Sequence, residues 1–441
     1  MSPAGTGARP PRSERSRAGG TAAAWDGAAS LSFAGAAQLL RPPEDGLEFI
    51  RGGQAATLTL EPGGLTARDG RIAALEHDPG SDLVVDARGC ALLPGFIDCH
   101  THLPFAGWRA SEYELRVGGA AYEEIARAGG GIAASARALR ETDDEGVLVQ
   151  ARAMALEMLA AGTTTFECKS GYGLSREGEL RALRLAAALD REVEQTTVST
   201  ALLAHAVPDG YSADSWMDEV EAMLPAVVDG GHVSALDIFV ESIAFTNEHL
   251  ARMGELAARN GLFLHCHVEQ LGTHRSVPVA LAAGARSVDH LSQLHPDDVR
   301  PLAAARCAAV LLPGAEFLGA EHRAPARALL DAGAIVVLAT DANPGTSPVL
   351  SLPLVIGLGV RLYGLSTREA LAATTLNAAW ALGLAGDRGA LEVGKRADLV
   401  LLDEPAEHVA YRFGRNPVAA TFIAGAPAYV RPDAAWRVRA A

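Results

Sequence analysis

Eight short apolar segments, rich in β-branched residues, recur along this 441-residue chain. Segments with helical spacing lie between them, such as 177–193 and 247–261, and the second ends on a glycine suited to a helix C-cap. Strands that alternate with helices indicate a parallel sheet, and eight of them predict an α/β fold of the (β/α)8 TIM-barrel type. The segments are ALLPGFID (91–98), GTTTFECK (162–169), TTVSTALLAH (196–205), ALDIFVE (235–241), LFLHCH (262–267), RSVDH (286–290), CAAVLLPG (307–314) and AIVVLATD (334–341).

Two further β-rich stretches flank the predicted barrel. Residues 65–78 have the pattern of a β-hairpin around an Asp-Gly turn, and 389–405 have the pattern of another hairpin. We therefore expect a barrel domain over 91–386 and a small β-sandwich domain built from both chain ends, 31–90 and 387–441. Residues 1–30 are expected to form a disordered tail.

Charge and composition exclude several classes of partner. A net charge of −15, with basic residues clustered only in the N-terminal tail, argues against nucleic acid and anionic membranes. The tail lacks an apolar signal-peptide core, and no later stretch offers about 20 uninterrupted apolar residues. Five cysteines without a CxxC pair fit reduced thiols. These features favour a cytoplasmic protein that acts on small molecules.

Polar side chains gather where the apolar segments end. In (β/α)8 barrels the active site is built at the carboxyl ends of the strands. A single histidine at such a place is more often a core residue than a ligand, but a whole series at one rim indicates a site. The series comprises Asp98, His100, His102, Glu167, Lys169, His205, Glu241, His267, His290 and Asp341.

The His-x-His pair is typical of a metal site. If the first strand persists, alternation points Asp98, His100 and His102 to one face. Two exposed loop histidines would produce the same isolated pattern. Catalytic zinc takes about three protein ligands of the histidine and carboxylate type and keeps one position open for water. His100 and His102 follow the first segment, His267 ends the fifth, and Asp341 ends the eighth, so these three segment ends together supply such a set.

At these residues the chain resembles the amidohydrolase superfamily. PGFIDCHTHL matches the superfamily's motif at the start of the barrel, and GALEVGKRADLVLLD matches its motif after the barrel. Within it the chain resembles the imidazolonepropionase family, over roughly residues 65–418. The narrower likeness is carried by FECKSGYGL (166–174), LLAHAVP (202–208), HVEQL (267–271), VDHLSQL (288–294), LLPGAEFLG (311–319) and LATDANPGTSP (338–348).

The resemblance implies hydrolysis of the ring amide of 4-imidazolone-5-propanoate to N-formimino-L-glutamate in L-histidine degradation. It implies one divalent metal ion, zinc or iron, and it assigns Asp341 to accept the proton of water and His290 to stabilise the oxyanion or move protons. Arg109 matches the residue that binds the substrate carboxylate. The remaining substrate-binding positions implied by the resemblance are Tyr122, Tyr172, His205, Gln270, Asn343, Gly345 and Thr346. Gln270 is also counted with His290 and Asp341 among the catalytic positions.

Several positions depart from the superfamily pattern or leave their role open. Gln270 stands where glutamate is often found, and it cannot act as an acid or base, although Glu269 lies beside it. His265 is interpreted as a buried hydrogen-bonding residue rather than a ligand. Lys169 occupies a place where a carboxylated lysine could bridge two metals, but the KSGYGL match favours one metal. Residues 1–64 do not follow the family's short lead-in strand.

Two alternatives to this function remain at this point. The first is a related amidohydrolase, a cyclic amidase or aminopurine deaminase, with a different cyclic substrate. The second is a metal-bearing binding protein without turnover, which the intact ligand set disfavours. The oligomeric state is expected to be a homodimer, the commonest arrangement.

Overall fold

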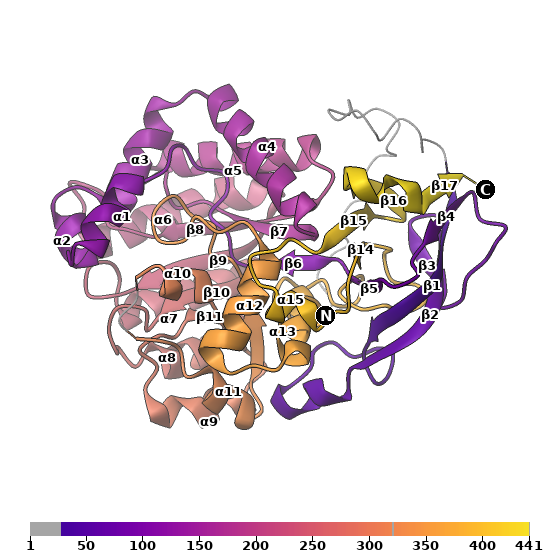
Figure 1. Ribbon diagram of the computed structural model, residues 1–441. Coiled ribbons are helices and arrows are strands. Elements are labelled where there is room, and N and C mark those ends of the chain that lie inside the picture. The colour runs from indigo at the N-terminus through magenta and orange to yellow at the C-terminus, as the bar shows by residue number, and fades with distance from the viewer. Residues whose placement is uncertain (1–27, 320–321, 441) are drawn as a thin grey trace.

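The computed structural model describes residues 28–319 and 322–440, apart from the side chains of residues 122 and 123. Most of the predicted tail, residues 1–27, lies outside this range. The described chain contains an eight-stranded barrel and a nine-stranded sheet beside it (Figure 1).

The eight barrel strands are all parallel, and each pairs with the next along the chain. A further parallel bridge between Thr101 and Ala342 joins the residues that follow the first and last strands. The predicted TIM-type barrel is therefore confirmed. Its strands are β6 (Phe96–Asp98), β7 (Thr163–Lys169), β8 (Thr196–Ala204), β9 (Val233–Val240), β10 (Phe263–Val268), β11 (Ser287–His290), β12 (Ala308–Leu311) and β13 (Ile335–Leu338).

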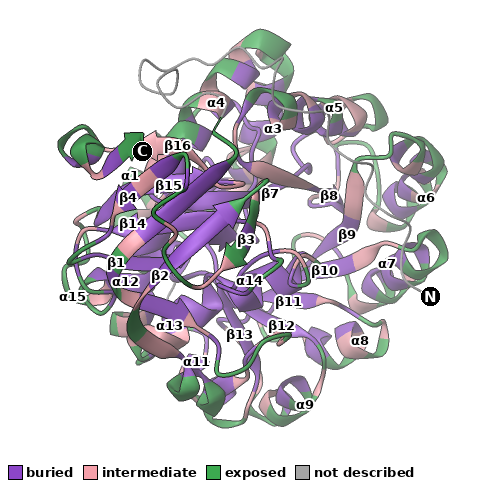
Figure 2. Cartoon of the chain, turned by 90° about the vertical axis from the view of Figure 1, so that its right-hand side faces the viewer, coloured by how far each residue is buried: buried purple, intermediate pink, exposed green. Residues whose placement is uncertain are grey.

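Helices surround the barrel, with buried faces toward the strands and exposed faces outward (Figure 2). The helices are α1 (Ala110–Val117), α2 (Tyr122–Arg127), α3 (Gly131–Glu141), α4 (Asp144–Ala160), α5 (Arg176–Glu192), α6 (Ala213–Asp229), α7 (Asn247–Asn260), α8 (Ser276–Ala282), α9 (Val299–Ala304), α10 (Pro313–Phe317), α11 (Ala326–Asp331), α12 (Leu352–Tyr363), α13 (Thr367–Ala373), α14 (Leu376–Ala381) and α15 (His408–Tyr411). Short 3-10 helices are η3 (Gly52–Thr57), η4 (Pro296–Asp298) and η5 (Pro432–Arg437).

Local sequence signals fix where several of these helices begin and end. The Ser175 side chain accepts a hydrogen bond from the Gly178 N–H at the start of α5, and Ser212 accepts from the Ser215 N–H at the start of α6. Helix α7 ends at Gly261, which adopts the left-handed conformation with φ 66°. The two helices expected from spacing, over 177–193 and 247–261, are thus present with these caps.

The nine-stranded sheet takes its strands from both ends of the described chain. The expected hairpin over 65–78 is confirmed, since β2 and β3 pair antiparallel around Asp69 and Gly70, both at positive φ. The strands are β1 (Ser30–Arg41), β2 (Thr59–Arg68), β3 (Arg71–Ala74), β4 (Leu83–Asp86), β5 (Ala91–Pro94), β14 (Leu399–Leu402), β15 (Val418–Ile423), β16 (Ala426–Val430) and β17 (Val438–Ala440).

Two expectations about strands are wrong. The segment 91–98 is not one barrel strand, because it divides at Gly95 into β5 of the nine-stranded sheet and β6 of the barrel. A Cβ at Gly95 would lie 2.3 Å from the Thr164 side chain, so only glycine fits this crossing. The segment 389–405 is not a hairpin, since only β14 forms there, and it pairs with β5 and β15.

The barrel and the nine-stranded sheet bury separate apolar clusters. In the sheet, Phe33 packs edge-on against Phe422 at 5.0 Å between ring centroids, which joins its N-terminal and C-terminal strands. The exact division into 31–90 with 387–441 and 91–386 stays a prediction. Among the described residues, no helix is both long and apolar enough to cross a membrane.

Candidate metal centre and active site

The His-x-His segment follows β6 and is held by backbone hydrogen bonds on both sides. The Asp341 N–H donates to the His100 carbonyl over 3.0 Å, and the His102 N–H donates to the Ala342 carbonyl over 2.9 Å. On the other side, the Lys169 N–H donates to the Thr101 carbonyl over 3.1 Å. Main-chain contacts from the second and eighth strand ends therefore fix the positions of both histidines.

Two overlapping groups of buried side chains could hold a metal ion. One contains His100, His267 and His290, the other contains His100, His102 and Asp341, and within each group the ligand atoms lie within 4.8 Å of one another. The Oδ1 of Asp341 lies 3.5 Å from Nε2 of His100 and 3.3 Å from Nε2 of His102. The two groups share His100, and together they contain the four residues expected as ligands and also His290.

Buried carboxylates orient two of these histidines from behind. Nδ1–H of His100 donates to Asp289 over 2.6 Å, and Nδ1–H of His267 donates to Asp237 over 3.0 Å. In both rings this leaves Nε2 as the lone-pair nitrogen, and neither Nε2 has a hydrogen-bond partner in the described part of the chain. Buried acceptors without partners are rare, and a histidine held by a carboxylate is the usual metal-binding arrangement. The residues therefore fit a divalent metal ion.

Burial also sets the protonation state of the histidines. It lowers the pKa of His100 and His102 well below the usual value, and it lowers the pKa of His290 to about 3. Neutral imidazole is the form that binds metal, so all three rings are in the appropriate state at neutral pH. Burial raises the pKa of Asp341.

Asp98 does not join this group, although strand alternation placed it there. Strand β6 ends at Asp98, so the alternation does not continue through His100 and His102. The Asp98 carboxylate accepts hydrogen bonds from the backbone N–H of Thr340 at 3.1 Å and from its hydroxyl at 2.6 Å. Burial raises its pKa to about 7. Asp98 therefore joins the first strand to the eighth.

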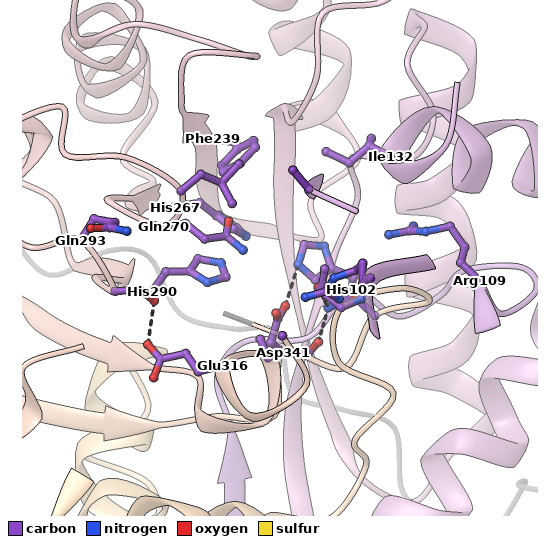
Figure 3. A pocket seen from close by; sticks show the side chains of 18 of the residues that line it. His102, Arg109, Ile132, Phe239, His267, Gln270, His290, Gln293, Glu316 and Asp341 are labelled. Carbon is purple, nitrogen blue, oxygen red and sulfur yellow. Dashed lines mark hydrogen bonds and ion pairs between the residues drawn. The ribbon is translucent and has the colours of Figure 1, made fainter. Parts of the chain in front are cut away.

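A cavity of about 390 Å³ opens above the histidines (Figure 3). Its volume suits a small molecule. His267, His290 and Asp341 line its floor with His102, and Arg109 lies across the cavity from His290. The other expected substrate-binding residues that line it are Tyr172, His205, Gln270, Asn343 and Thr346.

Arg109 is held in place by its surroundings. Its Nε–H donates to Glu112 over 2.9 Å, and its Nη1 donates to the Ser135 hydroxyl. Its backbone N–H donates to the Pro344 carbonyl over 2.7 Å. Gly345 does not line the cavity, but a Cβ there would lie 1.9 Å from Nη2 of Arg109. The glycine therefore makes room for the guanidinium.

His205 and Tyr172 form the aromatic wall beside the metal ligands. The His205 ring stacks on His102 with 5.2 Å between centroids, and Tyr172 lies 5.3 Å from His205. Nδ1 of His205 is 3.0 Å from the Gly171 carbonyl, which can only accept, so this nitrogen carries the ring proton. Tyr122 begins α2, and its side chain lies outside the described structure.

The loop after Asp341 is ordered by one asparagine. Oδ1 of Asn343 accepts hydrogen bonds from the backbone N–H groups of Gly345 at 2.9 Å and Thr346 at 2.7 Å. Nδ2 of Asn343 donates to the Asp341 carbonyl over 2.7 Å. Asparagine commonly orders turns in this way. The turn carries Asn343 and Thr346 to the cavity.

Of the three polar residues considered on and just after β10, one lines the cavity and two do not. Gln270 lines the cavity, and its backbone N–H donates to Glu241 over 2.9 Å. Glu269 is buried, and its carboxylate accepts from the backbone N–H groups of His274 and Ser276. His265 lies 2.7 Å from the Ser287 hydroxyl and belongs to neither metal-binding group.

Sequence reasoning missed several residues of the site. The histidine partners Asp237 and Asp289 each stand inside an apolar strand, and an acidic residue in such a run was the available signal. Other cavity residues, on helices, loops and one strand, carried no such signal. They include Arg116, Ile132, Phe239, Ser292, Gln293, Glu316 and His322.

Comparisons with known proteins agree with this geometry. Residues 91–427 match the amidohydrolase family. The solved structure of an adenosine deaminase from Xanthomonas campestris with bound zinc superposes with a TM-score of 0.67, covering 90% of this chain and 92% of that one. At 20% identity that likeness shows the fold alone. The barrel, the buried histidine and aspartate cluster and the family match define the chain as an amidohydrolase.

Curated relatives narrow the family further. The imidazolonepropionase of Paracoccus denitrificans is 43% identical over 381 residues, which cover 83% of this chain and 94% of the relative. The imidazolonepropionase of Cupriavidus necator is 45% identical over 340 residues, covering 76% of this chain and 81% of the relative. The chain belongs to the imidazolonepropionase family, and the resemblance noted in the sequence is confirmed.

Proposed function

We propose that the chain hydrolyses the ring amide of 4-imidazolone-5-propanoate to N-formimino-L-glutamate, the imidazolonepropionase step of histidine degradation. The observation that carries this proposal is the cavity with two different ends. At one end lie buried His100 and His267, whose Nε2 atoms accept no hydrogen bond within the described part of the chain, and at the other lies the Arg109 guanidinium. A cyclic amide with a carboxylate tail has one chemical group for each end.

The metal ligands in this proposal are His100, His102, His267 and Asp341. When bound, a divalent zinc or iron ion would activate water at neutral pH and polarise the amide carbonyl. The histidine and aspartate donors suit both metals, so the donor set does not select between them. Asp237 and Asp289 contact Nδ1 of His267 and His100, which would leave each Nε2 free to hold the ion.

Proton transfer is assigned to two residues at the floor of the cavity. Asp341 accepts the proton of the attacking water and returns a proton to the ring nitrogen that leaves. His290 is neutral, and its ring stabilises the oxygen that gains negative charge during attack. Gln270 cannot exchange protons, so its role is to hydrogen-bond the ring.

The substrate tail lies toward Arg109 in this arrangement. A planar guanidinium binds a carboxylate through two parallel hydrogen bonds, which fixes the ring over the metal centre. Tyr172 and His205 contact the ring and tail, and Tyr122 is assigned to the same end from the family resemblance. Asn343 and Thr346 close the cavity beside them, and Gly345 leaves space for Arg109.

The test is a spectrophotometric assay with 4-imidazolone-5-propanoate on protein whose metal content is measured. We expect turnover that is lost after chelation and restored by zinc or iron. Cyclic ureides and aminopurines serve as control substrates and are expected to react at least about a hundredfold more slowly. Turnover of a control substrate in preference to imidazolonepropanoate would reject the proposal, and bound metal without any turnover would indicate a binding protein.

We also propose that the enzyme acts as a homodimer in the cytoplasm. Cyclic dimers are the commonest assemblies of such proteins. All five cysteines are buried and unpaired, as expected in a reducing compartment. Light scattering of the purified protein tests the dimer, and fractionation of cells tests the location.

A further inference from the structure

Lys169 lies inside the barrel beneath the metal centre, and it is almost entirely inaccessible to solvent, at 1% exposure. The chain contains only one other lysine, Lys395, among 38 basic lysine and arginine residues. The Lys169 ammonium lies 2.6 Å from Oδ2 of Asp237 and 2.9 Å from Oε2 of Glu167. A buried cation persists only when anions and hydrogen bonds satisfy it, and both are present here.

The Asp237 carboxylate connects this lysine to a proposed metal ligand. Its Oδ2 accepts from Lys169, and its Oδ1 accepts from Nδ1 of His267 at 3.0 Å. Oδ1 also accepts from the Ile238 N–H at 2.7 Å. One carboxylate is thus fixed at both oxygens, and the ring it holds has Nε2 directed at the metal centre.

Lys169 also reaches the other ligands through its main chain. Its N–H donates to the carbonyl of Thr101, the residue between His100 and His102. The hydroxyl of Thr101 in turn donates to the Glu167 carbonyl. The end of β7 therefore touches both the His-x-His segment and, through Asp237, the histidine of β10.

We propose that Lys169 is a positioning residue of the metal centre, whose ammonium holds the Asp237 carboxylate that orients His267. The inference rests on the proposed role of His267 as a metal ligand. Without the ammonium, Oδ2 of Asp237 loses its charged partner, and an unpaired buried carboxylate must turn or recruit another donor. Either movement displaces His267 from the position in which its Nε2 meets the ion.

Electrostatic repulsion between the Lys169 ammonium and the metal ion would instead predict that removing the lysine strengthens metal binding. The ammonium, however, lies against the carboxylates of Glu167 and Asp237, and Asp289 also interacts with it. The Asp237 carboxylate, in direct contact with the ammonium, offsets its charge toward the metal. The positional effect on His267 is therefore expected to exceed the repulsion.

The experiment compares Lys169→Met with Lys395→Met. Lys395 is also buried and lies 3.2 Å from Glu392, but it belongs to the segment leading to the nine-stranded sheet. Metal affinity is measured by competition with a chelator, and the melting temperatures of the metal-free and metal-loaded proteins are compared. We expect Lys169→Met to bind metal roughly ten- to a hundredfold more weakly. Lys395→Met should keep the parental affinity even if its metal-free form melts earlier.

A second variant distinguishes a loss of metal affinity from a folding defect. Lys169→Met combined with Glu167→Gln removes one positive and one negative charge, so the balance is kept while the contact with Asp237 is lost. Its metal affinity should fall like that of the single variant. Asp237→Asn should weaken binding as well, and adding Lys169→Met to it should have little further effect. The visible spectrum of the cobalt-loaded protein should change in each variant, because it reports ligand geometry.

Parental or tighter metal binding in both Lys169 variants would overturn the proposal. Failure of both to fold while Lys395→Met folds would also overturn it, because Lys169 would then serve the barrel rather than the ion. His267→Ala separates this outcome from a failure of the proposed function. If His267→Ala loses metal and the Lys169 variants keep it, only the role of Lys169 is rejected, whereas full metal in His267→Ala rejects the ligand assignment itself.

Discussion

The two ends of the cavity are built in different ways. The metal end stands on strand ends of the barrel, where backbone hydrogen bonds or buried carboxylates fix His100, His102 and His267. The tail end depends on residues between β6 and β7, where Arg109 precedes helix α1. That helix buries none of its residues. In the proposed function, this difference separates a firmly held centre for the chemical step from a recognition end carried by peripheral elements.

In (β/α)8 barrels the chemical step and the choice of substrate rest on different elements. Chemistry at strand ends can persist while loops and helices between the strands change what is bound. Changes at the metal end should therefore abolish the reaction, and changes at the tail end should alter substrate binding alone.

The largest effect is expected at the metal end, from His267→Ala. Removing this ligand should lower metal content and reduce kcat/KM by at least roughly a hundredfold, because the activation of water is lost. His265→Ala is the matched control on the same strand, and it should keep its metal because His265 bonds Ser287 instead. Metal analysis and the imidazolonepropanoate assay check both variants. Stoichiometric metal in folded His267→Ala would point to His265 as the ligand.

At the tail end, Arg109→Met should leave metal content unchanged. The loss of a charged hydrogen-bonded contact is worth about 1.5–3 kcal/mol, which corresponds to a rise in KM of roughly ten- to a hundredfold. Steady-state kinetics with metal analysis measures this separation. Loss of metal in this variant would contradict the independence of the two ends.

The role of Arg109 can be tested further by measuring the Arg109→Met variant with an imidazolone that lacks the carboxylate. That compound should be a poor substrate for the parent enzyme and should lose little more with Arg109→Met, because the contact is already missing. Additive losses from the two changes would mean that Arg109 does not contact the carboxylate. The tail end would then need another cation.

Gly345→Ala should have a smaller effect in the same direction. The new Cβ would lie 1.9 Å from Nη2 of Arg109, so the guanidinium must shift while Glu112 and Ser135 still hold its other nitrogens. We expect KM to rise by about three- to tenfold, less than after loss of the whole side chain, and kcat to change little. An unchanged KM would show that the guanidinium tolerates displacement.

The residues at the metal end of the cavity could be predicted from the sequence more completely than those at the tail end. The strand ends could be predicted because apolar segments and their final residues are local features, and parallel strands bring those residues to one rim. Arg109 lies in an irregular segment, so only the family resemblance identified it. Asp237 and Asp289 were missed because nothing local tells which histidine a buried carboxylate will meet. Gly95 and 389–405 were misread because their partners, Thr164 and β5, are distant in sequence.

The smallest effect is expected from Gln270→Glu, on the wall of the cavity. The Gln270 backbone is held by Glu241, so the exchange of amide for carboxylate should not move the loop. The side chain is assigned only a hydrogen bond to the ring. We expect kcat/KM to stay within about fivefold of the parent, with metal content unchanged, since a single hydrogen bond of this kind contributes about 1 kcal/mol. Steady-state kinetics across pH 6–9 measures it. A loss of a hundredfold or more would show that the amide N–H group is needed in the reaction, and proton transfer by Asp341 and His290 alone would then not explain turnover.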